Sequence, residues 1–324
     1  MPKYSKKVHN PRSLKKQRSL KKPRSLKKPR SLKKQRSLKK PRSLNNRRKK
    51  KRSQKGGVNT RSCVIKEHDD FNKSLSECSS ITFNPDSNIT EIPANAFEDF
   101  ILNLEQPIII PKKVISIGER AFYRCLKLTE IEFEPYSELK KIGKWAFAYC
   151  NALTNIIIPK SVTIIGDYAF MSCSNLTTIE FESDSQLTTI PNRAFTHCNA
   201  LTNITIPKSV TSIVDGAFLD CLKLTTIKFE PYSELKNIGE KAFEGCKSLE
   251  TIIIPNSVTS IGEGAFEGCK ALQTITIPDS VTTISRRAFA NCSLLETINI
   301  PKSVTSIGEG AFVGTPLEDI YKSF

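Results

Sequence analysis

The sequence predicts an α/β repeat solenoid, with one short parallel strand in each repeat, short helical turns on the opposite side and a basic tail in front. An Ala-Phe dipeptide occurs ten times, and consecutive copies are 23 or 25 residues apart. Repeats of this length are typical of solenoids, in which each unit buries its apolar side chains against its neighbours. The phenylalanines are Phe97, Phe122, Phe147, Phe170, Phe195, Phe218, Phe243, Phe266, Phe289 and Phe312.

Charge separates the tail from the repeats. Residues 1–55 contain 26 of the 50 lysines and arginines and none of the 32 acidic residues. A unit Pro/Gln-Arg-Ser-Leu-Lys-Lys runs through this segment, and its six-residue step puts no apolar stripe on a helix. Dense like charge with few apolar side chains cannot offset the entropy of ordering, so residues 1–60 are predicted to be disordered.

The tail ends in a cluster of six basic residues, which has two interpretations. It is typical of a nuclear import signal, and it also suits an arm that attracts a polyanion through phosphate charge. Both interpretations stay open from the sequence. The cluster consists of Arg47, Arg48, Lys49, Lys50, Lys51 and Arg52.

The tail is followed by a predicted N-terminal cap at residues 61–80 and by about ten repeats at residues 81–324. The cap is indicated by Phe71, Leu75 and Cys78, which are apolar but do not follow the repeat pattern. At the other end Thr315 replaces the cysteine of the repeat. Degenerate terminal copies are typical of the capping units of solenoids.

One repeat shows how the pattern predicts local structure. Ile156 and Ile158 alternate with Ile157, so the first two face the core of a short strand and Ile157 points outward. Pro159 ends the strand, because proline has no N–H for a ladder. The Ala-Phe-x-x-Cys segment at residues 169–173 has helical spacing and predicts a short helical turn. Stacked copies would form one continuous core with parallel strands.

The full repeat resembles a known family. Residues 249–269 follow L-x-x-I-x-I-P-x-S-V-T-x-I-G-x-x-A-F-x-x-C, and residues 201–221 follow it except for Val214 in place of the glycine. This pattern is similar to the BspA-like class of leucine-rich repeats. The resemblance covers about residues 78–324 and implies a right-handed leucine-rich-repeat solenoid used for binding. Many bacterial and protozoan members of that class are surface proteins, so the resemblance also implies a host-contacting surface protein as one alternative.

The outward-facing side chains of the strands are the predicted partner-binding surface. Isoleucines occur among them, which is unexpected on a face exposed only to water, and extended solenoid faces commonly bind proteins. We therefore predict a non-catalytic scaffold that binds a protein partner through this column. Its members are Ile109, Glu132, Ile157, Glu180, Thr205, Lys228, Ile253, Thr276 and Asn299.

Eight of the ten cysteines occupy the same place in consecutive repeats and are predicted to be buried, reduced thiols. A disulfide requires Cα atoms about 4.4–6.8 Å apart, whereas the axes of packed helices lie about 8–10 Å apart. The ladder consists of Cys125, Cys150, Cys173, Cys198, Cys221, Cys246, Cys269 and Cys292.

The sequence predicts no catalytic residue, no cofactor and no metal site. The chain has three histidines and no Cys-x2-Cys pair, so the spacing of a zinc site is missing. His197 precedes Cys198, but no third group that could orient a nucleophile accompanies them. The glycines of residues 262–268 lack the Gly-Lys-Ser/Thr ending of a phosphate loop.

The sequence also predicts the compartment. The first ten residues are polar and no apolar segment of a signal peptide follows them, and no apolar run is long enough for a membrane span. We expect an intracellular protein, cytoplasmic or nuclear, with export by a route that needs no signal peptide left open. The alternative function is a nucleic-acid-associated protein that binds through its tail.

Overall fold

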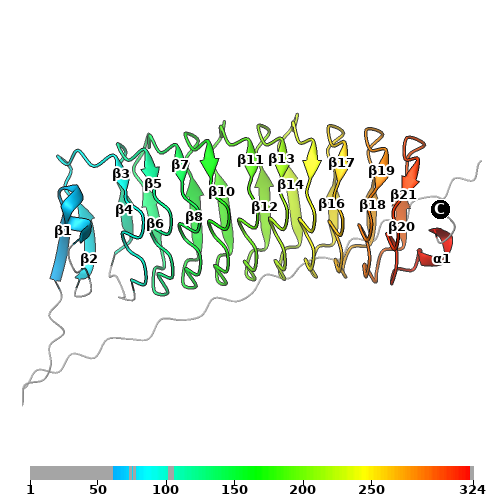
Figure 1. Ribbon diagram of the computed structural model, residues 1–324, viewed down its shortest axis with the longest axis horizontal. Helices are drawn as coiled ribbons and strands as arrows, with labels where there is room; N and C mark the ends of the chain where they lie inside the picture. Colours follow the sequence, from blue (N-terminus) through cyan, green and yellow to red (C-terminus); the bar gives the residue numbers. More distant parts are fainter. Residues whose placement is uncertain (1–60, 73–74, 76–77, 101–105, 322–324) are drawn as a thin grey trace, which may run out of the picture. The chain divides into compact units, whose positions relative to one another are not determined.

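The computed structural model describes residues 61–72, 75, 78–100 and 106–321. The tail, with the basic cluster Arg47, Arg48, Lys49, Lys50, Lys51 and Arg52, lies outside the described residues. The predicted fold class is confirmed: the body is a parallel-strand solenoid in which each turn repeats the previous one along the chain (Figure 1). Each repeat contributes a longer and a shorter strand, whereas the sequence predicted only the longer one.

The longer strands form the face that carries the predicted binding column. Seven of them make one parallel sheet in the order β20-β18-β16-β14-β12-β10-β8, and β4 pairs with β6 in a second sheet. Their bounds are β4 Ile108–Ile110, β6 Ile131–Phe133, β8 Asn155–Ile158, β10 Thr178–Phe181, β12 Asn203–Ile206, β14 Thr226–Phe229, β16 Thr251–Ile253, β18 Thr274–Thr276 and β20 Thr297–Asn299.

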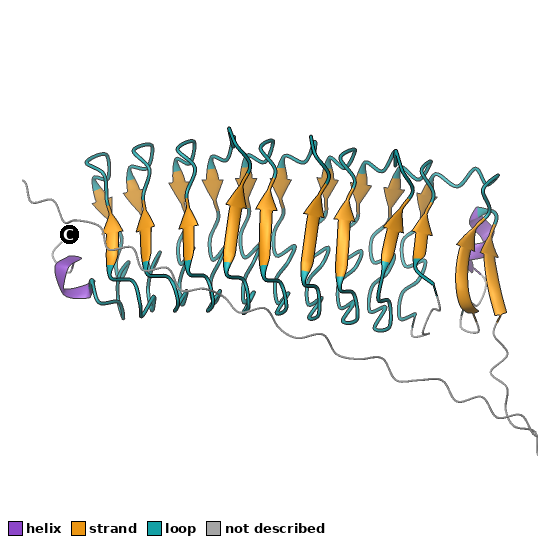
Figure 2. Cartoon of the chain, turned by 180° about the vertical axis from the view of Figure 1, so that it is seen from behind, coloured by secondary structure: helices purple, strands orange, loops and turns teal. Residues whose placement is uncertain are grey.

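The shorter strands form a second row across the core (Figure 2). They pair in parallel in the orders β3-β5-β7-β9, β11-β13-β15-β17 and β19-β21. Their bounds are β3 Glu91–Ile92, β5 Ser116–Ile117, β7 Lys141–Ile142, β9 Ile164–Ile165, β11 Thr189–Ile190, β13 Ser212–Ile213, β15 Asn237–Ile238, β17 Ser260–Ile261, β19 Thr283–Ile284 and β21 Ser306–Ile307.

The core is a stack of equivalent side chains from consecutive repeats. The ten Ala-Phe phenylalanines lie ring on ring, with centroids 4.9 to 5.7 Å apart and ring planes within 3° to 17° of each other. Eight of these rings, from Phe122 to Phe289, have no exposed surface. Each ring between the two ends of the stack therefore stacks on the rings of the repeats before and after it, as expected where repeats contact only adjacent repeats.

The Ala-Phe-x-x-Cys segments are tight turns rather than the predicted helical turns. The residues two before and two after each phenylalanine have positive φ angles, for example Tyr168 at 59° and Ser172 at 59° around Phe170. The N–H of Phe170 donates to the carbonyl of Ala194 in the next repeat at 2.9 Å. A helix would use these N–H groups within the segment, whereas here they join neighbouring repeats, a requirement that the spacing of one repeat cannot reveal.

The eight ladder cysteines are buried free thiols, which confirms the sequence interpretation. Each Sγ donates to the carbonyl of the Ala-Phe phenylalanine in the preceding repeat at 3.0 to 3.2 Å, as Cys246 does to Phe218. Burial raises the pKa of seven of these thiols and raises that of Cys173 to about 12. A buried thiolate would lose its hydration, so the neutral form is favoured.

Both ends of the described solenoid depart from the repeat. At the N-terminal end β1, Arg61–Ile65, pairs in parallel with β2, Cys78–Phe83, and the 3-10 helix η1, His68–Asn72, lies between them in sequence. A disulfide joins Cys63 to Cys78. The sequence interpretation did not include this bond.

At the C-terminal end the short helix α1, Glu318–Tyr321, places Tyr321 4.7 Å from the ring of Phe312. Thr315 replaces the ladder cysteine, and its hydroxyl donates to the carbonyl of Phe312 at 2.6 Å. Among the described residues, no helix is long and apolar enough to cross a membrane.

Candidate functional site

The predicted binding column is exposed in the structure. All nine of its residues project from the longer strands or their immediate ends into solvent. Ile109, Ile157 and Ile253 expose 46%, 52% and 82% of their surfaces, whereas the residues directly before and after each of them are buried. The alternation predicted from one repeat therefore holds in all three of these strands.

Strand pairing divides this column into groups. The register places Ile109 opposite Glu132, Ile157 opposite Glu180, and Thr205 opposite Lys228. Ile253, Thr276 and Asn299 form the last group. The column is thus not one uninterrupted row, because the strands separate between the groups.

The strands separate on the C-terminal side of the copies in which the longer strand ends in Phe and is followed by Glu. In these copies the connection after the strand is two residues longer than in the Ile-Pro copies. β14 pairs with the preceding β12 over four residues but with the following β16 only at Thr226 and Ile227. β10 behaves in the same way between β8 and β12, and β6 and β8 belong to different sheets.

Each of the three longer connections is attached to the preceding repeat by one glutamate. Glu230 Oε2 accepts a hydrogen bond from the backbone N–H of Lys208 at 2.9 Å, and the equivalent bonds run from Lys112 to Glu134 and from Lys160 to Glu182. These hydrogen bonds close one side of each longer connection and leave the other side open.

The open side between β14 and β16 is a slot of about 780 Å³. Phe229, Tyr232 and Lys228 line one wall, and Ile253 and Asn256 line the other. A smaller hollow of about 200 Å³ continues across Ile253 toward β18. The volume of the main slot lies within the range of protein ligand sites, about 300–1,000 Å³.

The equivalent positions between β10 and β12 hold an ion pair instead. Lys208 Nζ lies 3.3 Å from Asp184 Oδ1, and these two residues correspond to Asn256 and Tyr232 of the slot. Tyr232 is 95% exposed and has a φ of 62°. Aspartate tolerates a positive φ angle far better than a bulky side chain does, so the tyrosine does not stabilise the turn.

The slot residues outside the column were missed by sequence reasoning. The column analysis considered only side chains that point out of the strands, so it included Lys228 and Ile253 but neither Tyr232 nor Phe229. The two extra residues of the Phe-Glu copies were the available signal, since a longer connection beside a shorter one leaves space between them.

A cluster of aromatic and basic side chains lies on the turns of the second to fourth Ala-Phe copies. Arg120 lies over Trp145 at 4.7 Å and over Tyr123 at 5.4 Å, and Lys144 lies 4.7 Å from the Trp145 ring centroid. Tyr168 continues the row 5.5 Å beyond Trp145. These side chains are half-buried against one another except Lys144, so the cluster stabilises the stacking of these repeats through cation–π contacts.

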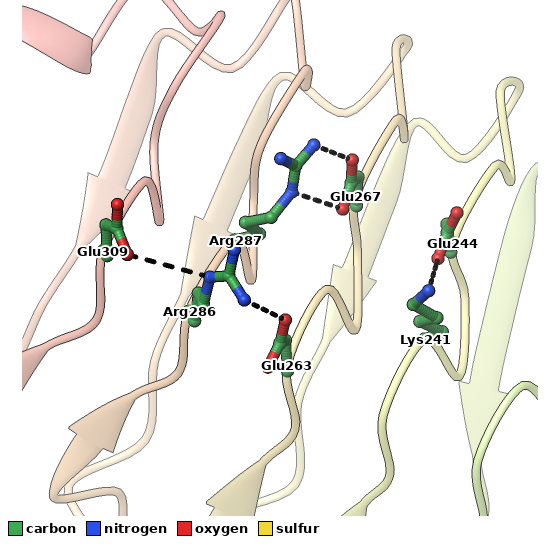
Figure 3. A network of polar contacts seen from close by, with 7 residues as sticks. All are labelled: Lys241, Glu244, Glu263, Glu267, Arg286, Arg287 and Glu309. Atoms are coloured by element: carbon green, nitrogen blue, oxygen red, sulfur yellow. Dashed lines mark hydrogen bonds and ion pairs between the residues drawn. The ribbon is translucent and has the colours of Figure 1, made fainter.

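A ladder of ion pairs occupies the turns of the later repeats (Figure 3). Arg286 lies between Glu263 at 3.3 Å and Glu309 at 3.9 Å, and Arg287 Nε donates to Glu267 at 3.0 Å. The hydrogen bond with Glu267 raises the pKa of Arg287. Lys241 lies 3.7 Å from Glu244, and desolvation raises the pKa of that carboxyl. The pairs of Arg286 and Arg287 link consecutive repeats across the surface, whereas Lys241 and Glu244 belong to the same turn.

The structure separates the two residues that could suggest a catalytic thiol. Cys198 is buried and donates to the carbonyl of Phe170 at 3.2 Å. His197 points instead to Asp220, with Nδ1 3.7 Å from Oδ2. Within the described ranges, no group of three or more His, Cys, Asp and Glu residues could hold a metal ion.

Comparisons with known proteins fit this repeat geometry. The family model described as "BspA type Leucine rich repeat region (6 copies)" matches residues 90–225 and 211–323. No curated protein sequence matches the chain.

Three solved structures illustrate the similarity. A leucine-rich repeat protein from Bacteroides ovatus is 27% identical over 70% of this chain and 80% of that one, with a TM-score of 0.34. The T. pallidum leucine rich repeat protein is 27% identical over 66% and 85%, with a TM-score of 0.43. The pneumococcal vaccine antigen PcpA is 20% identical over 72% and 74%, with a TM-score of 0.43.

Proposed function

Because the chain belongs to the BspA-type leucine-rich repeat family, we propose that it is a non-catalytic scaffold that binds a partner protein through its longer-strand face. The observation that carries this proposal is the exposure of Ile109, Ile157 and Ile253 on that face. Single exposed apolar side chains are common on proteins, but isoleucines recurring along one sheet face favour a contact surface.

A matched pair of substitutions tests the proposal. Ile157 and Ile164 are 52% and 53% exposed, but Ile157 lies on the longer-strand face and Ile164 on the row of shorter strands. A lysine at either position exposes the same charge and removes the same apolar surface. We expect Ile157→Lys to reduce the partner recovered with the tagged full chain from its source cells by at least about tenfold, and Ile164→Lys to leave recovery unchanged. Equal effects of the two substitutions would contradict the proposal.

A second candidate function concerns the tail and is favoured by its charge. Residues 1–55 carry 26 basic and no acidic side chains, which suits sequence-independent attraction to nucleic acid or another polyanion. The same cluster, Arg47 to Arg52, suits nuclear import. From this charge pattern we propose that the protein is located in the cytoplasm or the nucleus.

Imaging the full chain and a chain that begins at Gly57 in the source cells tests the compartment. Loss of a nuclear signal on truncation would support an import or nucleic-acid role. Surface staining would favour the host-contacting alternative instead.

A further inference from the structure

The slot between β14 and β16 has features that the folded chain itself does not require. Tyr232 stands 95% exposed at a positive φ angle, where one equivalent copy carries Asp184 and the other carries Tyr136, which is 91% exposed. Ile253, across the slot, is 82% exposed, more than the other isoleucines of this face. Neither side chain gains burial from the fold, and the tyrosine adds backbone strain.

The slot combines an apolar interior with one free positive charge. Phe229 and Ile254 contribute apolar surface to its walls. Lys228 also lines it, and in the part of the chain that the structure describes no ion pair involves Lys228. Glu230 also lines the slot, and its carboxylate accepts a hydrogen bond from the backbone N–H of Lys208. A ligand that fits would therefore present an apolar group next to a carboxylate.

The shape favours a protein segment over a small molecule. The lining residues run from Thr226 to Ser233 on one wall and from Thr251 to Ser257 on the other, so the slot is elongated along the strands. Tyr232 and Ile253 line opposite walls and are largely exposed, so a small ligand held inside would cover only part of each side chain. An extended chain lying along the slot would cover both, as interface tyrosines are commonly covered.

We propose that this slot is the specificity site of the longer-strand face, and that it binds an extended segment of a partner protein with an apolar side chain beside an aspartate or glutamate. The proposal rests on the proposed function and adds the place and the chemistry of the contact. The apolar side chain enters between Tyr232 and Ile253, and the carboxylate meets Lys228.

The chain itself supplies the design of a closed slot. Tyr232→Asp with Asn256→Lys copies the Asp184–Lys208 ion pair into the β14–β16 slot. Aspartate suits the positive φ better than tyrosine, so the double variant should keep its melting temperature. Tyr136→Asp is the matched control, because it places the same aspartate opposite Lys160 between β6 and β8, at the other exposed tyrosine.

The probe is a displayed library of random 12-residue peptides selected on the full chain. We expect enriched peptides to carry an aromatic or aliphatic residue close to an acidic one. Their affinity should fall about thirtyfold on the closed double variant and stay unchanged on Tyr136→Asp. Lys228→Glu should exchange the preference for acidic residues for one for basic residues.

Three results would overturn the proposal. Peptides that bind the closed variant as well as the natural chain, yet are lost with Ile157→Lys, would refute the slot while leaving the longer-strand face as the binding surface. If no peptide is enriched on the natural chain relative to the closed variant, the slot is not a site for a protein segment. A concentration-dependent dimer that the closed variant abolishes would assign the slot to a second copy of this chain.

Discussion

The seven ladder thiols whose pKa is raised by burial should make the solenoid lose stability steeply in alkali. Below pH 9 the thiols are protonated in both the folded and the unfolded state, and their contribution to stability is fully present. Above the unfolded value of 9.0 the unfolded thiols ionise, whereas Cys173 and Cys292 stay protonated in the fold up to about 12. Stability is therefore lost as the pH rises from 9 toward 12.

The magnitude follows from this difference. Between pH 8 and pH 10 each thiol that is neutral in the fold lowers the free energy of unfolding by about 1–2 kcal/mol. Seven thiols in one cooperative unit would lower it by about 10 kcal/mol, which is comparable to the whole stability of a typical domain. The measurement is urea denaturation followed by circular dichroism at pH 8, 9 and 10 in oxygen-free buffers.

A serine variant separates the thiols from other groups that titrate in this range. Cys221→Ser with Cys246→Ser keeps donors that can reach the carbonyls of Phe195 and Phe218, but the hydroxyls do not ionise. We expect the loss between pH 8 and pH 10 to shrink by about 3 kcal/mol in this variant. A pH dependence identical to that of the natural chain would refute the reasoning, because it would assign the titration to groups outside the ladder.

Three further predictions concern the core, the cap and the tail. Phe243→Ala should destabilise its region by about 3–5 kcal/mol, and hydrogen exchange should show the loss confined to neighbouring repeats, whereas uniform loss of protection would contradict coupling between adjacent repeats only. Mass spectrometry of protein alkylated without reductant should find Cys63 and Cys78 linked and eight cysteines modified after denaturation; ten modified cysteines would mean that the cap disulfide is absent in the source compartment. Nucleic-acid binding by the full chain should fall steeply with salt, and equal binding by a chain that begins at Gly57 would exclude the tail as the ligand site.

Local patterns in the sequence were enough to predict the repeating architecture. The alternation of Ile156, Ile157 and Ile158 predicted which side chain is exposed, because neighbouring residues of a strand always point to opposite faces. The common position of the cysteines predicted a buried ladder, since equivalent positions in stacked copies share one environment. The shorter strands were not predicted, because two residues are too few for a periodic pattern.

Only the tertiary structure decided the details that depend on contacts between copies. The Ala-Phe-x-x-Cys spacing is compatible with a helix, but the N–H of Phe170 bonds to the next repeat, so the segment becomes a pair of tight turns. Likewise, the acidic character of Glu230 was visible in the sequence, but its hydrogen bond to the backbone of Lys208 depends on a residue 22 positions away.

The sequence by itself therefore determined the period of the solenoid, the composition of its core and the face that carries exposed isoleucines. The physical reason is that burial in a repeat protein is set by local alternation and is copied from one unit to the next. The tertiary structure decided where that face opens into a slot. Glu230 holds the long connection after β14 to the repeat before it, whereas β14 itself pairs with only two residues of the repeat after it. This asymmetry arises from packing between unequal neighbours.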